Sequence, residues 1–212
     1  MKEKQIPVIT INREYGAGGR SLAQLLSERL NIPYYDGDFV KKTVKESGFD
    51  TEDVEREGEE LSRPSKMLNS FLNSAVSYSS SADAIFKAEK KVILELANSP
   101  CIIVGRCADR ILAEAGIDSV SIYLHAPFEY RLKRAKELGE NKDTKLEKYV
   151  EGHDRKRRTF YKEYTGCEMT DASNYTFCFD TAKVSIPVCA DIVIDLIENS
   201  SSGVMAEGGK EE

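Results

Sequence analysis

The chain has 212 residues, of which 41% are hydrophobic and 31% charged, and this composition fits an ordinary globular protein with one full hydrophobic core. Its formal net charge of -6 argues against a general nucleic-acid binder, which would carry a basic excess. No apolar stretch approaches the roughly 20 residues of a membrane span and no signal peptide is recognisable, so we expect a cytoplasmic protein that does not bind membranes.

The five cysteines form no pattern for metal or disulfide chemistry. They are odd in number, none belongs to a Cys-x-x-Cys pair, and only two histidines accompany them. A structural zinc site and a disulfide framework are therefore not expected. Each cysteine is better explained as a small buried or half-buried hydrophobic residue than as a nucleophile.

The first predicted element is a strand that leads through a glycine-rich loop into a helix. Residues 8–21 begin with an apolar β-branched run, continue through Gly16, Gly18 and Gly19, and end where an amphipathic helical pattern begins at Ser21. Glycine has no Cβ, so a backbone built from it can approach a ligand closely. Such a loop directs backbone N–H groups and the positive end of a helix at one place, which favours an anion, most often phosphate.

The glycine pattern matches two phosphate-binding motifs imperfectly. A dinucleotide motif, Gly-x-Gly-x-x-Gly, that starts at Gly16 ends on Ser21, although Asp36 lies at a suitable distance for a ribose contact. A P-loop, Gly-x-x-x-x-Gly-Lys-[Ser/Thr], has Arg13 at its first glycine and Gly19 at its lysine. A tight turn without a ligand is the third alternative, but three glycines beside arginines have no other evident use there.

Strands recur after this unit and alternate with helical patterns, which predicts an α/β fold with a parallel sheet. The continuous apolar run at residues 101–105 is typical of a central parallel strand that is buried on both faces. The other predicted strands are residues 33–36, 120–124 and 175–180. The predicted helices that follow the first one are residues 106–116, 127–138, 145–164 and 187–197.

Residues 38–98 depart from this alternation. Apolar residues at helical spacing over 68–76 and 85–96 predict helices whose apolar faces enter the core or a homodimer contact. Helices inserted at this point of such a sheet commonly close over an acceptor substrate. At the other end of the chain, the serine, glycine and charged residues of 200–212 predict a disordered tail.

Arg106 stands at the carboxyl end of the predicted central strand. Open α/β sheets bind their ligands at this end, and an arginine placed there can direct two N–H donors at one phosphate. The alternative is an exposed arginine on the first turn of the following helix.

The densest positive charge of this acidic chain lies in the predicted helix 145–164, where residues 154–158 are Asp-Arg-Lys-Arg-Arg. A local reversal of sign needs an anionic partner, which is either a phosphate chain or the acidic residues 46–60. In the preceding helix, Arg131 and Arg134 lie three residues apart and share a face.

The order of these motifs resembles the cytidylate kinase-like family of P-loop kinases. The motifs that carry the resemblance are residues 9–20, Tyr34-Tyr35-Asp36, residues 104–109, residues 153–158 with Tyr161, Asn174-Tyr175 and Asp180-Thr181. The resemblance covers residues 8–197, and it implies a three-layer sandwich in which helices cover both faces of a five-stranded parallel sheet. It also implies one domain over residues 1–199, with a helical acceptor-side insertion at 38–98 and an arginine-bearing lid at 142–172.

The resemblance further implies a role for each site residue. ATP would be bound by the loop residues Gly16, Ala17, Gly18, Gly19, Arg20 and Ser21 together with Arg157 of the lid. Mg²⁺ would be held by the Ser21 hydroxyl. The residues expected to bind the acceptor are Asp36, Arg106, Asp109 and Arg131. The expected catalytic residues are Arg20, Arg13, Arg155 and Arg158.

Two positions depart from true cytidylate kinases in an ungapped comparison. The phosphate-loop lysine becomes Gly19, so another cation must neutralise the charge on the β and γ oxygens, and Arg20 is the first candidate and Arg13 the second. The aspartate after the Gly-Arg pair becomes Cys107, which weakens the case for a cytidine preference because a thiol is a poor hydrogen-bonding partner.

The sequence therefore favours an ATP- and Mg²⁺-dependent kinase that phosphorylates a nucleoside monophosphate of the CMP or dCMP type. Its partners would be small nucleotides, without nucleic acid or membrane, and a homodimer is compatible with the apolar stripes. The alternative is a nucleotide-binding regulator that keeps the fold without transfer, motivated by the absent lysine and the replaced aspartate. An NAD enzyme is a distant third reading of the glycines.

Overall fold

Five strands form one sheet in the order β2-β3-β1-β4-β5, in a computed structural model that describes residues 6–36, 81–139 and 145–201. The strands are β1 (Val8–Arg13), β2 (Tyr34–Tyr35), β3 (Ile102–Val104), β4 (Ser119–His125) and β5 (Phe177–Asp180). Every neighbouring pair is parallel. All of the strands predicted from the sequence are therefore present.

The central position of β1 follows from its composition. Ile9 pairs with both Ile102 of β3 and Val120 of β4, and the side chains of β1 are buried up to its last residue, Arg13. A strand with hydrogen-bonded neighbours on both edges and helices on both faces is buried along its length, so even the polar residues Thr10 and Asn12 of β1 are buried.

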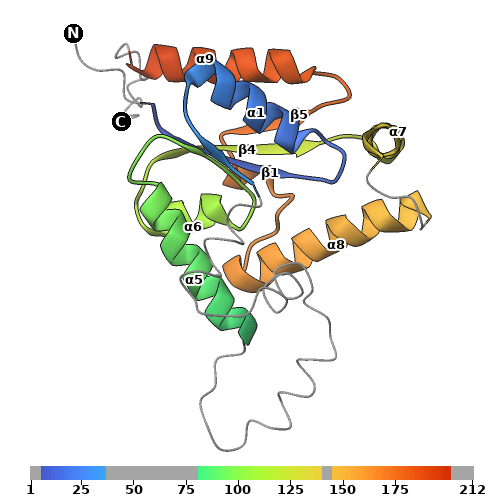
Figure 1. The fold of residues 1–212 in the computed structure, drawn as a ribbon, viewed down its shortest axis with the longest axis horizontal. Coiled ribbons are helices and arrows are strands. Elements are labelled where there is room, and N and C mark those ends of the chain that lie inside the picture. The colour runs from blue at the N-terminus through green and yellow to red at the C-terminus, as the bar shows by residue number, and fades with distance from the viewer. Residues whose placement is uncertain (1–5, 37–80, 140–144, 202–212) are drawn as a thin grey trace, which may run out of the picture.

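Helices cover both faces of the sheet (Figure 1). Above it in that view lie α1 (Gly19–Leu30) and α9 (Ile186–Ser201), and below it lie α5 (Ser81–Leu96), α6 (Ala108–Glu114) and α8 (Leu146–Thr165). The shorter α7 (Phe128–Leu138) follows β4, and a single 3-10 turn, η1 (Ala172–Asn174), precedes β5. The predicted three-layer α/β architecture is confirmed.

Each face of the sheet has its own hydrophobic core. The upper core joins the sheet to α1 and α9, and its buried residues include Ile9, Leu22, Leu26, Ile122 and Val193. The lower core joins it to α5, α6 and α8, and its buried residues include Val92, Ile103, Leu112, Tyr123 and Tyr161. A third, smaller cluster packs the loop after β1 against α7 and α8. This last cluster brings the two helices to the end of the sheet that holds the candidate site.

Some predicted boundaries need correction. The first helix begins at Gly19 rather than Ser21, because the left-handed Gly18 (φ 94°) turns the chain directly into it. Residues Ser200 and Ser201, expected in a disordered tail, belong to the last turn of α9. Three predicted segments lie outside the described residues: the rest of that tail, residues 38–80 of the insertion with the acidic 46–60 and the apolar 68–76, and residues 142–144 of the lid.

Candidate functional site

A pocket opens at the carboxyl end of β1, against the glycine loop (residues 14–18) and the start of α1. Eight of the predicted site residues line it: Arg13, Gly16, Gly18, Gly19, Arg20, Ser21, Asp36 and Arg157. Four further residues complete the lining: Glu14, Tyr15, Arg134 and Leu138. The structure thus brings together the residues expected to bind phosphate, from β1, the loop, α1, the end of β2, α7 and α8.

The glycine loop has the backbone of an anion-binding turn. Gly16 and Gly18 both have positive φ values, of 79° and 94°, which glycine adopts without the steric cost that a Cβ brings. No side chain caps the N-terminus of α1, where Gly18 is the N-cap residue. The first N–H groups of a helix need an acceptor, and together with the helix dipole they attract an anion such as phosphate.

The pocket is rich in guanidinium groups. Arg13, Arg20, Arg134 and Arg157 all line it. The Nε of Arg20 lies 3.0 Å from Asp36 Oδ2, and Nη2 of Arg13 lies 3.7 Å from Asp36 Oδ1. The two arginines differ in exposure, since the side chain of Arg20 is 68% exposed and that of Arg13 only 19%. Asp36 therefore holds two cations at the mouth of the pocket.

Ser21 lines the pocket in the first turn of α1. Its Oγ accepts a hydrogen bond of 2.9 Å from Nη2 of Arg134, and a hydroxyl oxygen has a second lone pair for a further ligand. The described residues contain no group of three or more His, Cys, Asp or Glu side chains that could hold a metal by themselves. Mg²⁺ seldom needs such a group, because water and phosphate oxygens complete its shell. Ser21, with Asp36 in the same pocket, fits that kind of site.

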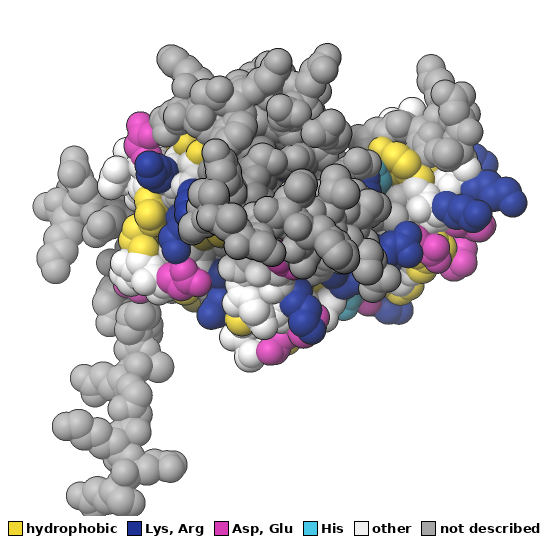
Figure 2. All heavy atoms as spheres, turned by 90° about the horizontal axis from the view of Figure 1, so that it is seen from below, with side chains coloured by type: hydrophobic (Ala, Val, Ile, Leu, Met, Phe, Trp, Pro, Cys, Tyr) yellow, Lys and Arg dark blue, Asp and Glu magenta, His cyan; other side chains and the backbone are white. Residues whose placement is uncertain are grey.

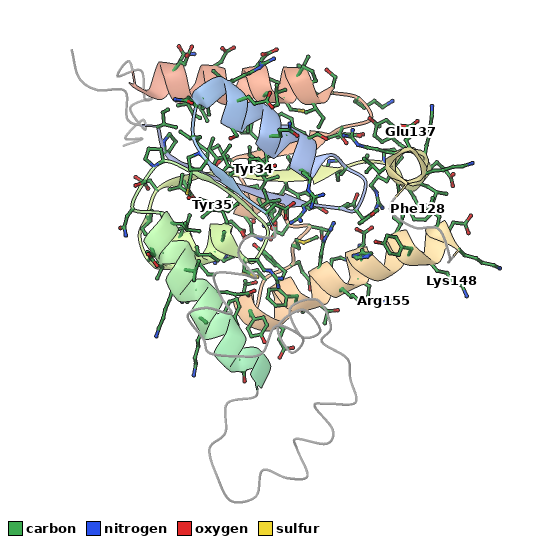
Figure 3. All side chains as sticks on the ribbon, in the orientation of Figure 1. Tyr34, Tyr35, Phe128, Glu137, Lys148 and Arg155 are labelled. Atoms are coloured by element: carbon green, nitrogen blue, oxygen red, sulfur yellow. The ribbon has the colours of Figure 1, made fainter. Side chains whose placement is uncertain are left out.

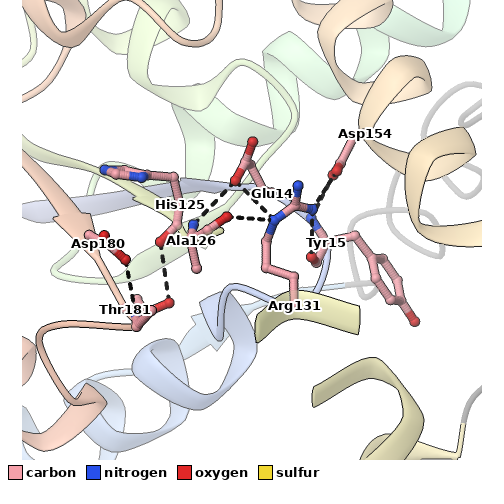
Figure 4. A network of polar contacts seen from close by, with 9 residues as sticks. Glu14, Tyr15, His125, Ala126, Arg131, Asp154, Asp180 and Thr181 are labelled. Atoms are coloured by element: carbon pink, nitrogen blue, oxygen red, sulfur yellow. Dashed lines mark hydrogen bonds and ion pairs between the residues drawn. The ribbon is translucent and has the colours of Figure 1, made fainter. Parts of the chain in front are cut away.

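Arg131, expected to bind the acceptor, is instead buried behind the glycine loop (Figure 4). Its Nη1 donates to Asp154 Oδ2 at 2.5 Å and to the Tyr15 carbonyl at 3.1 Å, while its Nε lies 3.1 Å from Glu14 Oε2. The other Asp154 oxygen accepts from the Tyr15 N–H at 2.6 Å. A guanidinium with this many partners holds the loop between α7 and α8, and its expected contact with the acceptor stays a prediction.

Asp109 is likewise buried and does not line the pocket. Its carboxylate accepts hydrogen bonds from Tyr161 Oη at 2.6 Å and from Asn12 Nδ2 at 2.8 Å. Burial raises the pKa of Asp109, and the two hydrogen bonds oppose that rise because they favour the charged form. The residue joins α6, β1 and α8, and its expected contact with the acceptor stays a prediction.

Arg106 occupies a turn with unusual backbone geometry after β3. Gly105, Arg106 and Cys107 all have positive φ values, and two of the three are not glycine, which is a strained arrangement often associated with function. Nη1 of Arg106 lies 3.3 Å from Oε1 of Glu89, whose side chain is 1% exposed. Burial raises the pKa of Glu89, and Arg106 works in the opposite direction. The guanidinium also lies 5.6 Å from the centre of the Phe160 ring.

Cys107 is buried, and burial raises the pKa of its thiol well above its ordinary value. The thiol therefore stays neutral at physiological pH and behaves as a small core residue, as expected from the sequence. Ala17, within the glycine loop, is fully buried, so any contact with a ligand would come from its backbone.

The arginines of α8 do not share one environment. Arg157 lines the pocket, with its guanidinium carbon 5.5 Å from the centre of the Tyr15 ring. Arg155 (Figure 3) and Arg158 are exposed on the same helix and do not line the pocket in the described part of the chain. Figure 3 also shows Phe128 of α7 facing α8, where it belongs to the small core that fixes the two helices beside the loop.

A comparison with protein families shows to which family this chain belongs. The model described as the cytidylate kinase-like family matches residues 8–183, which include the glycine loop, Arg106 and the arginines of α8. The chain belongs to this family. No curated protein sequence matches it.

Solved structures agree on the fold of this cytidylate kinase-like chain. An uncharacterized protein from Eubacterium ventriosum has a TM-score of 0.64 and 22% identity, with 91% of this chain and 98% of that one covered. Shikimate kinases from Bacteroides thetaiotaomicron and, in complex with shikimate, from Acinetobacter baumannii have TM-scores of 0.50 and 0.51 and identities of 15% and 14%. The alignments cover 91% and 93% of this chain and 98% and 96% of theirs. The fold is that of P-loop kinases.

Membership of the cytidylate kinase-like family gives a phosphotransferase of the nucleotide-kinase type. Sequence reasoning missed six residues of its site: the pocket residues Glu14, Tyr15, Arg134 and Leu138, and the supporting residues Asp154 and Glu89. Arg134 carried a usable signal, its spacing of three residues from Arg131. Asp154 was visible only as the single acid at the start of a basic run, and its partner, a backbone N–H 139 residues away, leaves no mark in the sequence.

Proposed function

We propose that this chain transfers the γ-phosphoryl group of ATP to a nucleoside monophosphate, most simply one of the CMP or dCMP type. The observation that carries the proposal is the pocket in which four arginines face a glycine loop and an uncapped helix N-terminus. Phosphoryl transfer needs little covalent chemistry from the protein, and it depends on positioning and on neutralising charge at the phosphate oxygens. This pocket has the groups for both tasks.

Different parts of the pocket would bind different parts of the nucleotide and its metal ion. The glycine loop and the N-terminus of α1 would bind the β-phosphate through backbone N–H groups. Ser21 would hold Mg²⁺, which when bound neutralises phosphate charge. Arg134 and Arg157, from α7 and α8, would lie along the phosphate chain. Arg155 and Arg158 would act only if the α8 side of the pocket closed further over the nucleotide.

The acceptor side would be built around Arg106. It stands one strand away from the glycine loop, because β3 and β1 are neighbours and their carboxyl ends lie at the same edge of the sheet. Glu89 holds its guanidinium from one side. A phosphate that reached Arg106 would meet a fork of donors, which is the geometry that phosphate binding favours.

A coupled ADP-release assay over a panel of nucleoside monophosphates tests the proposal. We expect ADP release above the blank without acceptor for at least one acceptor, with CMP and dCMP included in the panel. If no acceptor raises ADP release above that blank, the proposed transfer is wrong.

The acceptor role of Arg106 makes a separate prediction. Arg106→Ala should raise KM for the acceptor by roughly 10-fold or more and leave KM for ATP within about 2-fold, because a charge-assisted phosphate contact is worth about 1.5–3 kcal/mol. The matched control is Lys90→Ala, which removes an exposed cation of α5 that pairs with Glu114. Equal rises in both KM values would contradict the assignment.

The second candidate is a nucleotide-binding regulator without transfer activity. It is favoured by Gly19 at the lysine position of the P-loop motif and by Asp36, which already holds two of the pocket arginines. Calorimetry that detects ATP binding, combined with no turnover for any acceptor, would support the regulator. Turnover above the blank would exclude it.

A further inference from the structure

Aligned on Gly18, this chain departs from the P-loop motif at the first, seventh and eighth positions, and the eighth, Ser or Thr in the motif, is Arg20. The motif Gly-x-x-x-x-Gly-Lys-[Ser/Thr] places glycine at its first position and lysine at its seventh. In this chain Arg13 occupies the first position and Gly19 the seventh. The cation of the seventh position is therefore absent, and the nearest cations along the chain are Arg13, the last residue of β1, and Arg20 in the first turn of α1.

The stem of the Arg13 side chain fills the space beside Gly19. A Cβ at position 19 would lie 2.8 Å from Cγ of Arg13, 3.1 Å from Cδ and 3.3 Å from Cβ. These atoms stand near the base of the side chain, so they cannot move aside as the tip of a flexible chain can. Arg13 in this conformation and a side chain at position 19 therefore exclude each other.

The guanidinium of Arg13 reaches the turn that carries Arg106. A Cβ at Gly105 would lie 2.4 Å from Nη1 of Arg13, and Gly105 has a φ of +82° that disfavours a side chain in any case. On its other side, Nη2 lies 3.7 Å from Asp36 Oδ1. The charged group thus lies between the glycine loop, which would bind the donor, and Arg106, which would bind the acceptor.

We propose that Arg13 supplies the charge that the lysine supplies in other P-loops, and that Gly19 and Gly105 lack side chains because Arg13 passes over both. This inference rests on the proposed phosphoryl transfer and names the residue that stabilises it. In the reaction, an acceptor phosphate oxygen forms a bond to the γ-phosphorus. The bond between that phosphorus and the β–γ bridging oxygen breaks, and ADP leaves with the electron pair. Arg13 stays protonated throughout and acts on the charge of the moving group.

Arg13 fits this task better than Arg20, the first candidate from the sequence. The side chain of Arg13 is 19% exposed and begins on a buried strand, so few conformations compete with the one that faces the pocket. The side chain of Arg20 is 68% exposed and extends to the mouth of the pocket. Charge stabilisation is larger where water is excluded, which favours the less exposed group.

The roles of positions 13 and 19 can be tested by restoring the motif residues there. Arg13→Met keeps the stem that packs on Gly19 and removes only the charge, and it should lower kcat about 100-fold or more. Gly19→Lys alone should also lower kcat, because the new side chain collides with Arg13. The double variant Arg13→Gly with Gly19→Lys restores both motif positions and should exceed each of these single variants by roughly 10-fold. Arg29→Ala removes an exposed cation from the same helix as Gly19 and serves as the control.

Several outcomes would overturn the role of Arg13. One is a kcat of Arg13→Met within about 3-fold of the wild type. Another is a loss in Arg20→Ala as large as that in Arg13→Met, and a third is a double variant no better than the single ones. Circular dichroism and thermal unfolding of each variant separate these results from misfolding.

Measuring ATP affinity tests the role of Arg13 separately from the test of phosphoryl transfer. If the wild type releases no ADP with any acceptor, the proposed function fails, and ATP affinity then decides the role of Arg13. Arg13→Met should bind ATP at least about 10-fold more weakly and adenosine, which has no phosphate, equally well. Unchanged ATP affinity would overturn the inference whatever the turnover.

Discussion

The loop residue Gly16 has no room for a side chain. A Cβ at this position would lie 2.5 Å from the carbonyl oxygen of Arg131, and the φ of +79° is one that side-chain-bearing residues rarely adopt. The obstacle is backbone rather than a flexible side chain, so it cannot move aside cheaply. Gly16 is therefore required by the close approach of α7 as well as by the turn itself.

Replacing this glycine should be costly, and a second glycine provides the control. We expect Gly16→Ala to lower the free energy of unfolding by about 2 kcal/mol or more and to weaken ATP binding, because the loop must move away from Arg131. Gly152→Ala, within α8, meets nothing within 4 Å and should instead stabilise the protein by about 0.5–1 kcal/mol. Urea unfolding of both variants measures the difference, and equal effects would contradict the prediction.

At the scale of elements, α8 is fixed to the rest of the domain at two buried points. Asp154 accepts the Tyr15 N–H of the glycine loop, and two turns further along α8 Tyr161 donates to Asp109 of α6. Tyr149 and His153 add ring contacts to Tyr15, with centroid distances of 5.4 Å and 5.0 Å. The arginines of this helix are therefore held beside the loop, rather than delivered to it by free movement of the whole helix.

The buried pair of Arg131 and Asp154 should behave as a unit. Asp154→Leu alone leaves the guanidinium buried without its closest carboxylate, and we expect it to cost about 3 kcal/mol of unfolding free energy or more. Adding Arg131→Met should cost less than the sum of the two single substitutions, because the second change removes the uncompensated charge. A double-mutant cycle by urea denaturation checks this, and strictly additive losses would show that the pair does not interact.

For the whole molecule, the lower core contains three tyrosines whose ionisation is suppressed. Burial raises the pKa of Tyr123, Tyr161 and Tyr175 above the ordinary value of about 10, and nearby carboxylates such as Asp109 add to the rise for Tyr161 and Tyr175. Tyr123 and Tyr175 stack with centroids 5.2 Å apart, so these groups belong to one layer between the sheet and α8. These three phenols therefore stay protonated only while the lower core is folded.

Alkaline pH should therefore unfold the protein. Above a pH of about 10 the unfolded chain releases phenolic protons that the folded chain keeps, so the free energy of unfolding is unaffected by these groups below that pH and falls as the pH rises above it. Tyr161→Phe removes one such group and should flatten the decline. Urea midpoints between about pH 8 and 11 measure both slopes, and identical slopes would refute the prediction.

One face of the molecule carries described side chains of both charges. On the face shown in Figure 2, the described Lys and Arg side chains lie among Asp and Glu side chains. Four arginines, from β1, α1, α7 and α8, line the pocket together with Glu14 and Asp36. None of the helices in the described part of the chain is long and apolar enough to span a membrane.

How far the sequence predicted this protein depends on the range of the interactions involved. The strands, α7 and α8 were predicted within a few residues, because hydrophobic period and stop signals such as Gly139 are local. The glycine loop was predicted for the same reason. The burial of Arg131 and Asp109 was not predicted, because a buried arginine and an exposed one have the same sequence signal and only their long-range partners distinguish them.

The sequence by itself determined the parallel α/β sheet, the glycine loop at the end of β1 and the family of the chain. Hydrophobic periodicity and motif spacing can be recognised in a sequence without knowledge of tertiary contacts. The tertiary structure decided what each charge does. It placed Arg13 over Gly19 and Gly105, and it committed Arg131 to Asp154. Those roles depend on packing between residues far apart in the chain. The strength of an electrostatic interaction depends on the distance between the charges and on their burial, and both are set by the tertiary structure.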